Sequence, residues 1–288
     1  MDMVKRIQKC LVCNHVIFSS NKISVGRKYF YLRCNFCTSG LIQPLPNQSQ
    51  LKKYYHTQDY YMGLSKKVRN LCLQKIFSVQ LYKTYGDWVN SHFNKKGVVL
   101  DVGPGNGEFL AELKNVGWDV WGSDFSMMAA KNTSQKIGDN RIKVGQFYRQ
   151  NWTKSFDLIT FWHVLEHTRE PQKYMRKSYK ILKNGGRIFG EVPNFDSPWL
   201  WLFKDRYAWI MVPVHVIYFS PQSVRYLLEK AGYKNIEVHT PPRALLNFAL
   251  SVNKNPIISG LLSPLSVIFG LLLSLLGKGE VVRFTASK

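Results

Sequence analysis

The sequence contains few acidic residues for its length. Its 288 residues include 18 Asp and Glu against 40 Lys and Arg, which gives a formal net charge of +22 with histidine neutral. A surface with this excess of positive charge attracts polyanions, so nucleic acid and an anionic membrane surface are both candidate partners. Charge alone does not separate the two.

The chain also lacks a segment that would mark it for secretion. It begins Met-Asp-Met-Val-Lys-Arg and reaches two cysteines without the apolar run of about 7–15 residues that a signal peptide carries. We therefore expect the protein to remain in the cytosol. Glycine and proline are not in excess, at 20 and 12 residues, and 45% of the residues are hydrophobic. This composition excludes a disordered or fibrous chain and allows one large domain with small additions.

Cysteine is scarce, but four of the five cysteines form two pairs. Cys10 and Cys13 make one C-x-x-C motif, and Cys34 and Cys37 make the second after twenty intervening residues. This spacing is typical of a zinc ribbon, in which each turn points two thiolates at one tetrahedral ion. Disulfides or unrelated thiols are the alternatives, and a cytosolic location disfavours disulfides. We expect a structural zinc, because four thiolates leave no open position for a substrate.

Beyond the ribbon, a linker and a long helix precede a regular alternation of strands and helices. Short apolar runs predict strands at 98–101, 118–122, 156–161 and 187–192, and helical spacing predicts helices at about 66–93, 108–116 and 171–182. This alternation predicts an α/β fold with a doubly wound, mostly parallel sheet.

A glycine-rich turn follows the first of these strands. The segment Asp-Val-Gly-Pro-Gly-Asn-Gly at 101–107 leads from a buried strand into a helix, and its glycines let the backbone approach a ligand at the helix N-terminus. The spacing differs from the G-x-G-x-x-G of dinucleotide-binding folds. Asp124 ends the next strand, where a carboxylate can accept two ribose hydroxyls; a solvated strand end is the alternative.

Three motifs in this order resemble those of the class I S-adenosylmethionine-dependent methyltransferases. They are the glycine turn, Phe-Asp-Leu-Ile-Thr-Phe-Trp-His-Val-Leu-Glu-His at 156–167, and Leu-Lys-Asn-Gly-Gly-Arg-Ile-Phe-Gly-Glu-Val-Pro-Asn at 182–194. The similarity covers roughly residues 54–240 and the extreme C-terminus. It implies a seven-stranded Rossmann-like sheet with S-adenosylmethionine as cofactor. A zinc ribbon ahead of such a domain is similar to methyltransferases of sugar and cell-surface glycan pathways.

The same resemblance implies which residues would contact the cofactor. They are Asp101, Gly103, Gly105, Gly107, Asp124, Phe125, Gln146 and Phe161. The first four would hold the methionine part, Asp124 the ribose and Phe125 one face of the adenine. Many relatives have an acidic residue where this chain has Gln146, whose side-chain carbonyl can accept the same hydrogen bond from the adenine amino group.

Two histidines are candidates for the base that methyl transfer to a hydroxyl requires. His163 follows the strand at 156–161, at the sheet edge where ligands bind, although a hydrogen-bonded structural histidine is the alternative. His215 precedes Tyr-Phe-Ser-Pro in the aromatic segment 195–220, which relatives use as the acceptor-side wall; a hydrophobic lid without specificity is the alternative. The candidate acceptor contacts are Tyr60, Tyr61, Asn194, Arg206 and Trp209.

Enzymes that methylate exocyclic amines carry Asp or Asn, two prolines and an aromatic residue after the fourth strand. This chain has Phe-Trp-His-Val-Leu-Glu-His at 161–167 instead. A flipped base would find no evident stacking partner here, which argues against nucleic acid as the substrate.

One long segment near the C-terminus lacks charge altogether. Residues 256–276 contain no charged side chain, and by length alone they could span a bilayer. The flanking segments 235–239 and 280–286 are expected to be the last two strands of the sheet, paired antiparallel to each other, so a single crossing is excluded. Pro264 predicts two short helices, 256–263 and 265–276, that dip into one leaflet, with Lys254, Lys278 and Arg283 among anionic headgroups. A buried helical pair or a dimer interface is the alternative.

The expected parts are a zinc ribbon (1–45), a linker with N-terminal helices (46–97), a methyltransferase domain (98–255), an apolar helical hairpin (256–277) and a last strand (278–288). We expect an O-methyltransferase for a lipid-linked or glycan acceptor, bound peripherally or monotopically at the cytosolic membrane face. The alternatives are a soluble sugar-nucleotide methyltransferase with the apolar segment as a dimer interface, an RNA methyltransferase, and a binding protein without catalysis. The acceptor, the methylated atom and the oligomeric state stay open.

Overall fold

The computed structural model describes residues 8–17, 22–25, 28–47, 49–51, 71–204, 207, 209–242 and 268–288, with only the backbone for 71–79. The strands are β1 (Gln8–Lys9), β2 (Val16–Ile17), β3 (Lys22–Val25), β4 (Tyr29–Arg33), β5 (Gly40–Gln43), β6 (Val98–Val102), β7 (Asp119–Asp124), β8 (Ile142–Val144), β9 (Phe156–Trp162), β10 (Leu182–Pro193), β11 (Ile217–Tyr218), β12 (Lys234–His239) and β13 (Val281–Ser287). The helices are α3 (Leu71–Asn90), α4 (Glu108–Asn115), α5 (Met127–Ile137), α6 (Pro171–Ile181), α7 (Pro198–Phe203) and α8 (Pro221–Lys230), with short 3-10 turns η1 (Asp139–Arg141), η2 (Phe147–Arg149) and η3 (Leu165–His167).

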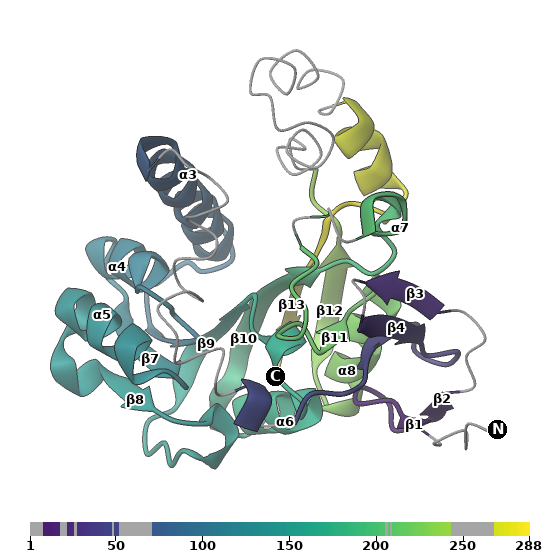
Figure 1. Ribbon diagram of the computed structural model, residues 1–288. Helices are drawn as coiled ribbons and strands as arrows, with labels where there is room; N and C mark the ends of the chain where they lie inside the picture. Colours follow the sequence, from purple (N-terminus) through teal and green to yellow (C-terminus); the bar gives the residue numbers. More distant parts are fainter. Residues whose placement is uncertain are drawn as a thin grey trace. The chain divides into compact units, whose positions relative to one another are not determined.

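The largest sheet has seven strands in the order β12-β13-β10-β9-β6-β7-β8 (Figure 1). Strand β6 pairs in parallel with β7 and β9, and β7 pairs in parallel with β8. Strand β13 runs antiparallel to β10, because Lys288 N bonds Gly186 O near one end and Asn194 N bonds Glu280 O near the other. The predicted α/β class with a doubly wound, mostly parallel sheet is confirmed.

The strand boundaries differ from the predicted ones where the local pattern is weak. Strand β10 begins at Leu182, earlier than the predicted 187, and β9 continues to Trp162. Strand β8 was not predicted, because its three residues are exposed or half-buried and carry no apolar run. The edge position of β8 explains why it needs none.

The chain forms two compact units. The first comprises Met1–Pro46, His163–Met175 and Gly190–Ala286, and the second comprises Asn47–Trp162, Arg176–Phe189 and Ser287–Lys288. The glycine turn therefore belongs to the second unit, whereas the cysteine pairs and both candidate histidines belong to the first.

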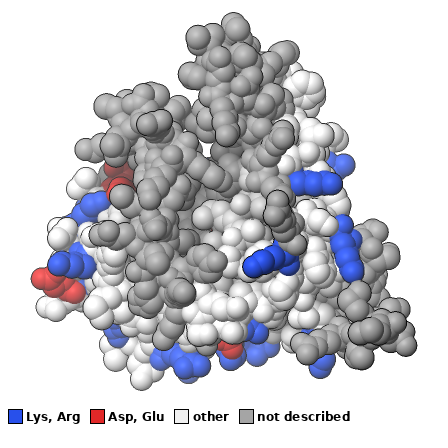
Figure 2. Space-filling model, viewed as in Figure 1, with Lys and Arg blue, Asp and Glu red and all other residues white. Residues whose placement is uncertain are grey.

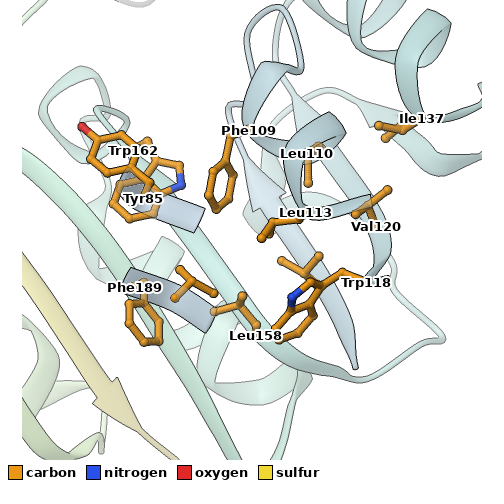
Figure 3. Close-up of a cluster of buried hydrophobic side chains, with 12 residues drawn as sticks. Tyr85, Phe109, Leu110, Leu113, Trp118, Val120, Ile137, Leu158, Trp162 and Phe189 are labelled. Atoms are coloured by element: carbon orange, nitrogen blue, oxygen red, sulfur yellow. The ribbon is translucent and has the colours of Figure 1, made fainter. Parts of the chain in front are cut away.

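The second unit has an aromatic core to which the helix after the glycine turn contributes (Figure 3). Tyr85 of α3 stacks on Trp162 at the end of β9, with ring centroids 4.0 Å apart, and Phe109 of α4 meets the same indole edge-to-face. Helix α4 buries Phe109, Leu110 and Leu113. Burial of these side chains fixes α4 against the sheet and so fixes the turn that precedes it.

The cysteine-containing segment forms a sheet of its own with one strand from far along the chain. The four-stranded order is β11-β5-β4-β3, and β11 pairs antiparallel with β5, with Ile217 opposite Leu41. Strands β1 and β2 pair separately. The pairing of β5 with β11 was not predicted, because strands so distant in the chain leave no local pattern.

The charge-free segment is described only at its end. Residues 268–275 are helical, within the predicted helix 265–276, while 256–267 lie outside the described residues, as do Tyr60, Tyr61 and Arg206. In the described parts of the chain, we find no helix long and apolar enough to cross a membrane.

Candidate active site

The glycine turn after β6 forms an open cradle. Gly103, Gly105 and Gly107 all have left-handed φ values, of 74°, 59° and 78°. A Cβ at Gly107 would lie 3.0 Å from Thr133, whereas a Cβ at Gly105 would meet no atom within 4 Å. The turn thus needs glycine for its conformation, and open space lies over Gly105 for a ligand to occupy.

Asp124 borders the same cradle. Its Oδ1 accepts a hydrogen bond from Ser126 N at 2.7 Å, and its Oδ2 accepts a long one, 3.4 Å, from Gly105 N. Burial raises the pKa of Asp124 to about 6, although the two hydrogen bonds act to lower it. The side chain is therefore a carboxylate at neutral pH. Oδ2 retains the capacity to accept ribose hydroxyls.

Asp101 lies deeper in the second unit. It is 2% exposed and accepts a 2.6 Å hydrogen bond from Thr160 Oγ1. Burial raises the pKa of Asp101 to about 8, and the negative charge of Asp124 raises it further, while the hydrogen bond from Thr160 acts to lower it. A positively charged group bound nearby would favour the ionised form.

The expected adenine side is built from the loop after β8. Tyr148 Oη donates to Gln146 Oε1 at 2.8 Å, which leaves the second lone pair of that carbonyl for a ligand. Phe125 is half-buried. Phe161 is fully buried, edge-to-face against Phe147, and so supports this loop from within. Its direct contact with a cofactor remains a prediction.

These residues fit S-adenosylmethionine. The open space over Gly105, the weakly bonded carboxylate oxygen of Asp124 and the buried carboxyl of Asp101 offer a cradle, a ribose acceptor and an acidic group in one unit. When bound, this cofactor supplies an electrophilic methyl group.

His163 lies at the centre of a buried charged network in the first unit. Its Nδ1 lies 3.3 Å from Glu166 Oε1 and its Nε2 3.1 Å from Glu191 Oε1, and Glu191 Oε2 accepts from Arg283 Nε at 2.6 Å. Burial acts to lower the pKa of His163, but the bonds to Glu166 and Glu191 outweigh it and raise the pKa to about 9. At neutral pH the ring is therefore an imidazolium.

The backbone at His163 is also unusual. Its φ is 55°, in the left-handed region that a non-glycine residue adopts only at a cost of roughly 1–3 kcal/mol. Its ring stacks on Trp209, with centroids 4.7 Å apart and planes at 19°, and its side chain is 22% exposed. The candidate base and one candidate acceptor residue are thus in direct contact.

His215 has different surroundings. It is 2% exposed, its Nδ1 lies 3.3 Å from Tyr218 Oη, and its ring meets His167 edge-to-face. Burial places its pKa well below the ordinary value, with further lowering from the neighbouring His167 and His163, so the ring is neutral. A neutral ring could accept a proton, but this one is enclosed by protein.

Asn194 uses its side chain within the protein. Its Nδ2 donates to Gly279 O at 2.8 Å and Gly277 O at 3.3 Å, and its Oδ1 accepts from Asp196 N at 3.0 Å. This side chain therefore ties the end of β10 to the start of β13. A role in acceptor binding remains a prediction.

The four paired cysteines come together in the first unit. Their sulfur atoms all lie within 4.8 Å of one another, and all four residues are buried. The Sγ distances of 3.6 Å for Cys10–Cys37 and 3.5 Å for Cys13–Cys34 are too long for disulfides and close to the roughly 3.8 Å between thiolates on a tetrahedral zinc. The donor set fits zinc, and Cys10, Cys13, Cys34 and Cys37 would hold it.

Several residues that complete these sites escaped the sequence analysis. Thr160 bonds Asp101, Tyr148 bonds Gln146 and Glu191 bonds His163. Arg283 was expected among anionic headgroups, and this expectation is wrong: Arg283 is 8% exposed and donates to Glu191. Glu166 lies within the predicted motif at 156–167 but was given no role there, and its side chain bonds His163. No spacing along the chain marks such partners.

Comparison with known proteins places these features in one family. The family model described as a methyltransferase domain matches residues 79–238, more than half of the chain. The chain belongs to the class I S-adenosylmethionine-dependent methyltransferases. The family predicted from the three motifs is therefore confirmed.

Known methyltransferases resemble this chain over part of its length. The ubiquinone biosynthesis O-methyltransferase of Erwinia tasmaniensis is 30% identical over 139 residues, which are 44% of this chain and 56% of that protein. The enzyme of the same name from Glaesserella parasuis is 32% identical over 113 residues, 36% of this chain and 47% of its own. This methyltransferase thus spans about half the length of the curated relatives it matches.

Solved structures agree on the fold. An S-adenosylmethionine-dependent methyltransferase from Archaeoglobus fulgidus covers 80% of this chain and all of its own, with a TM-score of 0.57 and 20% identity. The plantazolicin methyltransferase BamL, solved with S-adenosylhomocysteine, covers 83% of this chain and 94% of its own, with a TM-score of 0.55 and 16% identity. At these identities the likeness concerns the fold.

Proposed function

We propose that this methyltransferase transfers a methyl group from S-adenosylmethionine to a hydroxyl of a lipid-linked or glycan acceptor at the cytosolic face of a membrane. Its curated relatives carry the name of an O-methyltransferase of ubiquinone biosynthesis, which supports oxygen as the target and an apolar acceptor. The acceptor candidates are a lipid-linked sugar, a polyprenyl carrier and a quinone precursor.

The observation that carries the membrane part is an exposed apolar helix in the first unit. Along residues 268–276 the side chains exposed by about half or more are Ile268, Phe269, Leu271, Leu272, Leu275 and Leu276. Each such side chain that passes fully from water into an apolar environment contributes roughly 1.5–3 kcal/mol. Exposed apolar side chains gathered on one helix mark a surface that binds lipid or another protein.

Hydrogen bonds connect this apolar helix to residues at the ends of two strands of the large sheet. Thr240, just after β12, donates through Oγ1 to Ser274 O at 3.0 Å and accepts from Ser274 Oγ through its carbonyl oxygen. Asn194 Nδ2 bonds Gly277 O at the end of the helix. A lipid-inserted helix would thus be held at the ends of β12 and β10.

Exposed basic residues directly follow two exposed apolar segments in the sequence. Lys278 is exposed two residues after the apolar run, and Lys204 is exposed directly after α7, whose Trp201 and Leu202 are also exposed. On the face shown in Figure 2, basic side chains outnumber acidic ones among the described residues. Each basic residue near an anionic leaflet contributes about 1 kcal/mol, which favours lipid over a protein partner.

Between the two histidines, we assign the base to His163. Its side chain is 22% exposed, whereas His215 is enclosed at 2%. The longer of its two carboxylate contacts, 3.3 Å to Glu166, is the one an acceptor hydroxyl would replace, while Glu191 holds Nε2 and Arg283 holds Glu191. In its deprotonated form, His163 would take the hydroxyl proton at Nδ1 while the oxygen bonds the methyl carbon and the bond from that carbon to the sulfonium sulfur breaks, leaving a neutral thioether.

Vesicle binding tests the membrane part. The double variant Leu272→Glu, Leu275→Glu places two charges among the exposed leucines, and we expect it to lower affinity for anionic vesicles by tenfold or more in a sedimentation assay. The matched control Val116→Glu changes an exposed apolar residue (43%) after α4 in the other unit and should bind as wild type.

The same assay separates the alternatives. A wild-type protein that stays in the supernatant as a dimer, and becomes monomeric in the double variant, would show that the apolar helix is a subunit interface. That result would favour a soluble sugar-nucleotide methyltransferase.

A further inference from the structure

The four-stranded sheet of the zinc ribbon, in the order β11-β5-β4-β3, includes one strand from the segment that carries His215. Strand β5 pairs with β11, with Leu41 opposite Ile217, and Ile42 N donates to Val216 O at 3.1 Å. The ribbon and the segment expected to form the acceptor-side wall therefore share a backbone hydrogen-bond ladder. A separate ribbon domain joined by a linker would share none.

Ribbon side chains bond the same segment. Tyr31 of β4 is fully buried, donates through Oη to His215 O at 3.1 Å and meets the Tyr218 ring edge-to-face at 4.7 Å. Thr38 Oγ1 lies 2.5 Å from Ser220 Oγ, and Ser220 is the N-cap of α8. The segment from 215 to 220 is thus bonded to the ribbon at both ends.

Both cysteine turns accept hydrogen bonds at their backbone carbonyls from residues of α6 or the start of α8. Gln172 Nε2 donates to Val12 O, within the first turn, at 2.7 Å. Ser220 Oγ and Gln222 Nε2 donate to Cys37 O and Phe36 O of the second turn, at 3.4 Å and 3.2 Å. An ion held by both turns would therefore connect α6 with the start of α8.

The segment also bonds the residues around His163. Val216 N donates to Glu166 O at 2.8 Å, and His167 Nδ1 lies 3.2 Å from Val214 O. Glu166 in turn reaches Nδ1 of His163. A path of hydrogen bonds therefore leads from β5 through β11 to the candidate base.

We propose that the zinc ribbon is a positioning element of the acceptor side: with zinc bound, it fixes residues 214–220 and, through the backbone hydrogen bond from Val216 to Glu166, the turn that carries His163. The cofactor cradle lies in the other unit and should not depend on the ribbon. The expected effect on turnover rests on the proposed function. The ordering of residues 214–220 by zinc, and an affinity for the cofactor that does not change with zinc, can be tested without it.

The first test compares the full chain with zinc and after removal of zinc by a chelator. Amide hydrogen exchange should increase at least tenfold in peptides covering 209–220 and 163–170 and stay unchanged in peptides covering 98–110. Calorimetry should give a Kd for S-adenosylmethionine that changes less than twofold. Unchanged exchange at 209–220 would overturn the proposal, and so would parallel loss of protection at 98–110 and of cofactor affinity.

A substitution tests the same proposal without removing the metal. Tyr31→Phe retains the ring and removes only the hydroxyl that bonds His215 O, so exchange at 214–218 should rise about fivefold. The control Tyr29→Phe removes a hydroxyl from the same strand at a position that pairs with Val25 of β3, and should behave as wild type. Equal exchange in the two variants would overturn the proposal.

Kinetics distinguish this proposal from the proposed function. With an accepted substrate, Tyr31→Phe should lower kcat severalfold without changing the Kd of the cofactor. If no membrane acceptor is methylated, the proposed function fails, while exchange and calorimetry still decide whether the ribbon orders residues 214–220.

Discussion

At the scale of single residues, the ionisation of His163 decides how the proposed chemistry depends on pH. Two buried carboxylates, Glu166 and Glu191, hold an imidazole whose pKa is raised to about 9. A base must be deprotonated to accept a proton, so the active fraction of His163 should increase as the pH rises through 9.

We therefore expect kcat of the wild type to rise from pH 7 toward pH 9. Replacing one carboxylate, in Glu191→Gln, should lower the pKa of His163 and move this rise to lower pH, because less negative charge then remains to stabilise the imidazolium. An NMR titration of the ring protons of His163 measures the same shift without relying on turnover. A plateau of kcat already reached at pH 7 in the wild type would contradict the assignment of His163.

The same pKa has a consequence for stability. A folded-state pKa above the unfolded value of about 6.5 means that protonated His163 stabilises the folded state fully below pH 6.5. This contribution should diminish as the pH rises toward 9 and be absent above it. Denaturant unfolding of wild type and Glu191→Gln across this range should show a smaller pH dependence in the variant.

At the scale of elements, the glycine turn and the long-range pairings differ in how far the sequence predicts them. The strands at 98 and 156 were predicted from apolar runs, and β6 and β9 begin at those residues. The turn could be predicted because its backbone conformation requires glycine at three positions, each of which has a left-handed φ value.

Other parts could not be predicted from local pattern. Strand β11 pairs with β5 although about 175 residues separate Leu41 from Ile217. Glu191 of β10 bonds His163, and Arg283 of β13 bonds Glu191 in turn. Only the fold brings them together. The motif at 156–167 singled out His163 as a candidate, but Glu191, which raises its pKa, could be identified only from the structure.

The glycine turn permits a matched comparison of two substitutions. Gly105 and Gly185 both have left-handed φ values, of 59° and 76°, and open space where a Cβ would stand. Alanine at either position should therefore lower the free energy of unfolding by a similar amount, roughly 1–2 kcal/mol. Only Gly105→Ala should also weaken S-adenosylmethionine binding, by tenfold or more, because its methyl group enters the cradle.

Calorimetry and denaturant unfolding of the two variants check this prediction. Equal cofactor affinity in Gly105→Ala and Gly185→Ala would show that the cofactor does not lie over Gly105.

At the scale of the whole molecule, the excess of basic residues acquires a more specific interpretation. The net charge of +22 was compatible with nucleic acid or an anionic membrane. The methyltransferase motifs disfavour a base as substrate, and the described end of the apolar segment is an exposed helix followed by Lys278. Much of the positive charge would then face lipid headgroups, with the ribbon ordering the acceptor side and the second unit holding the cofactor.

The most direct test is transfer of an isotope-labelled methyl group from S-adenosylmethionine to native membrane extract, followed by mass spectrometry of the lipid and aqueous fractions. Wild-type protein should give a product in the lipid fraction that carries the labelled methyl group on oxygen. Asp124→Ala, which lacks the proposed ribose acceptor, should give little or none at the same cofactor concentration. Label confined to water-soluble products, or equal labelling by wild type and Asp124→Ala, would contradict the account.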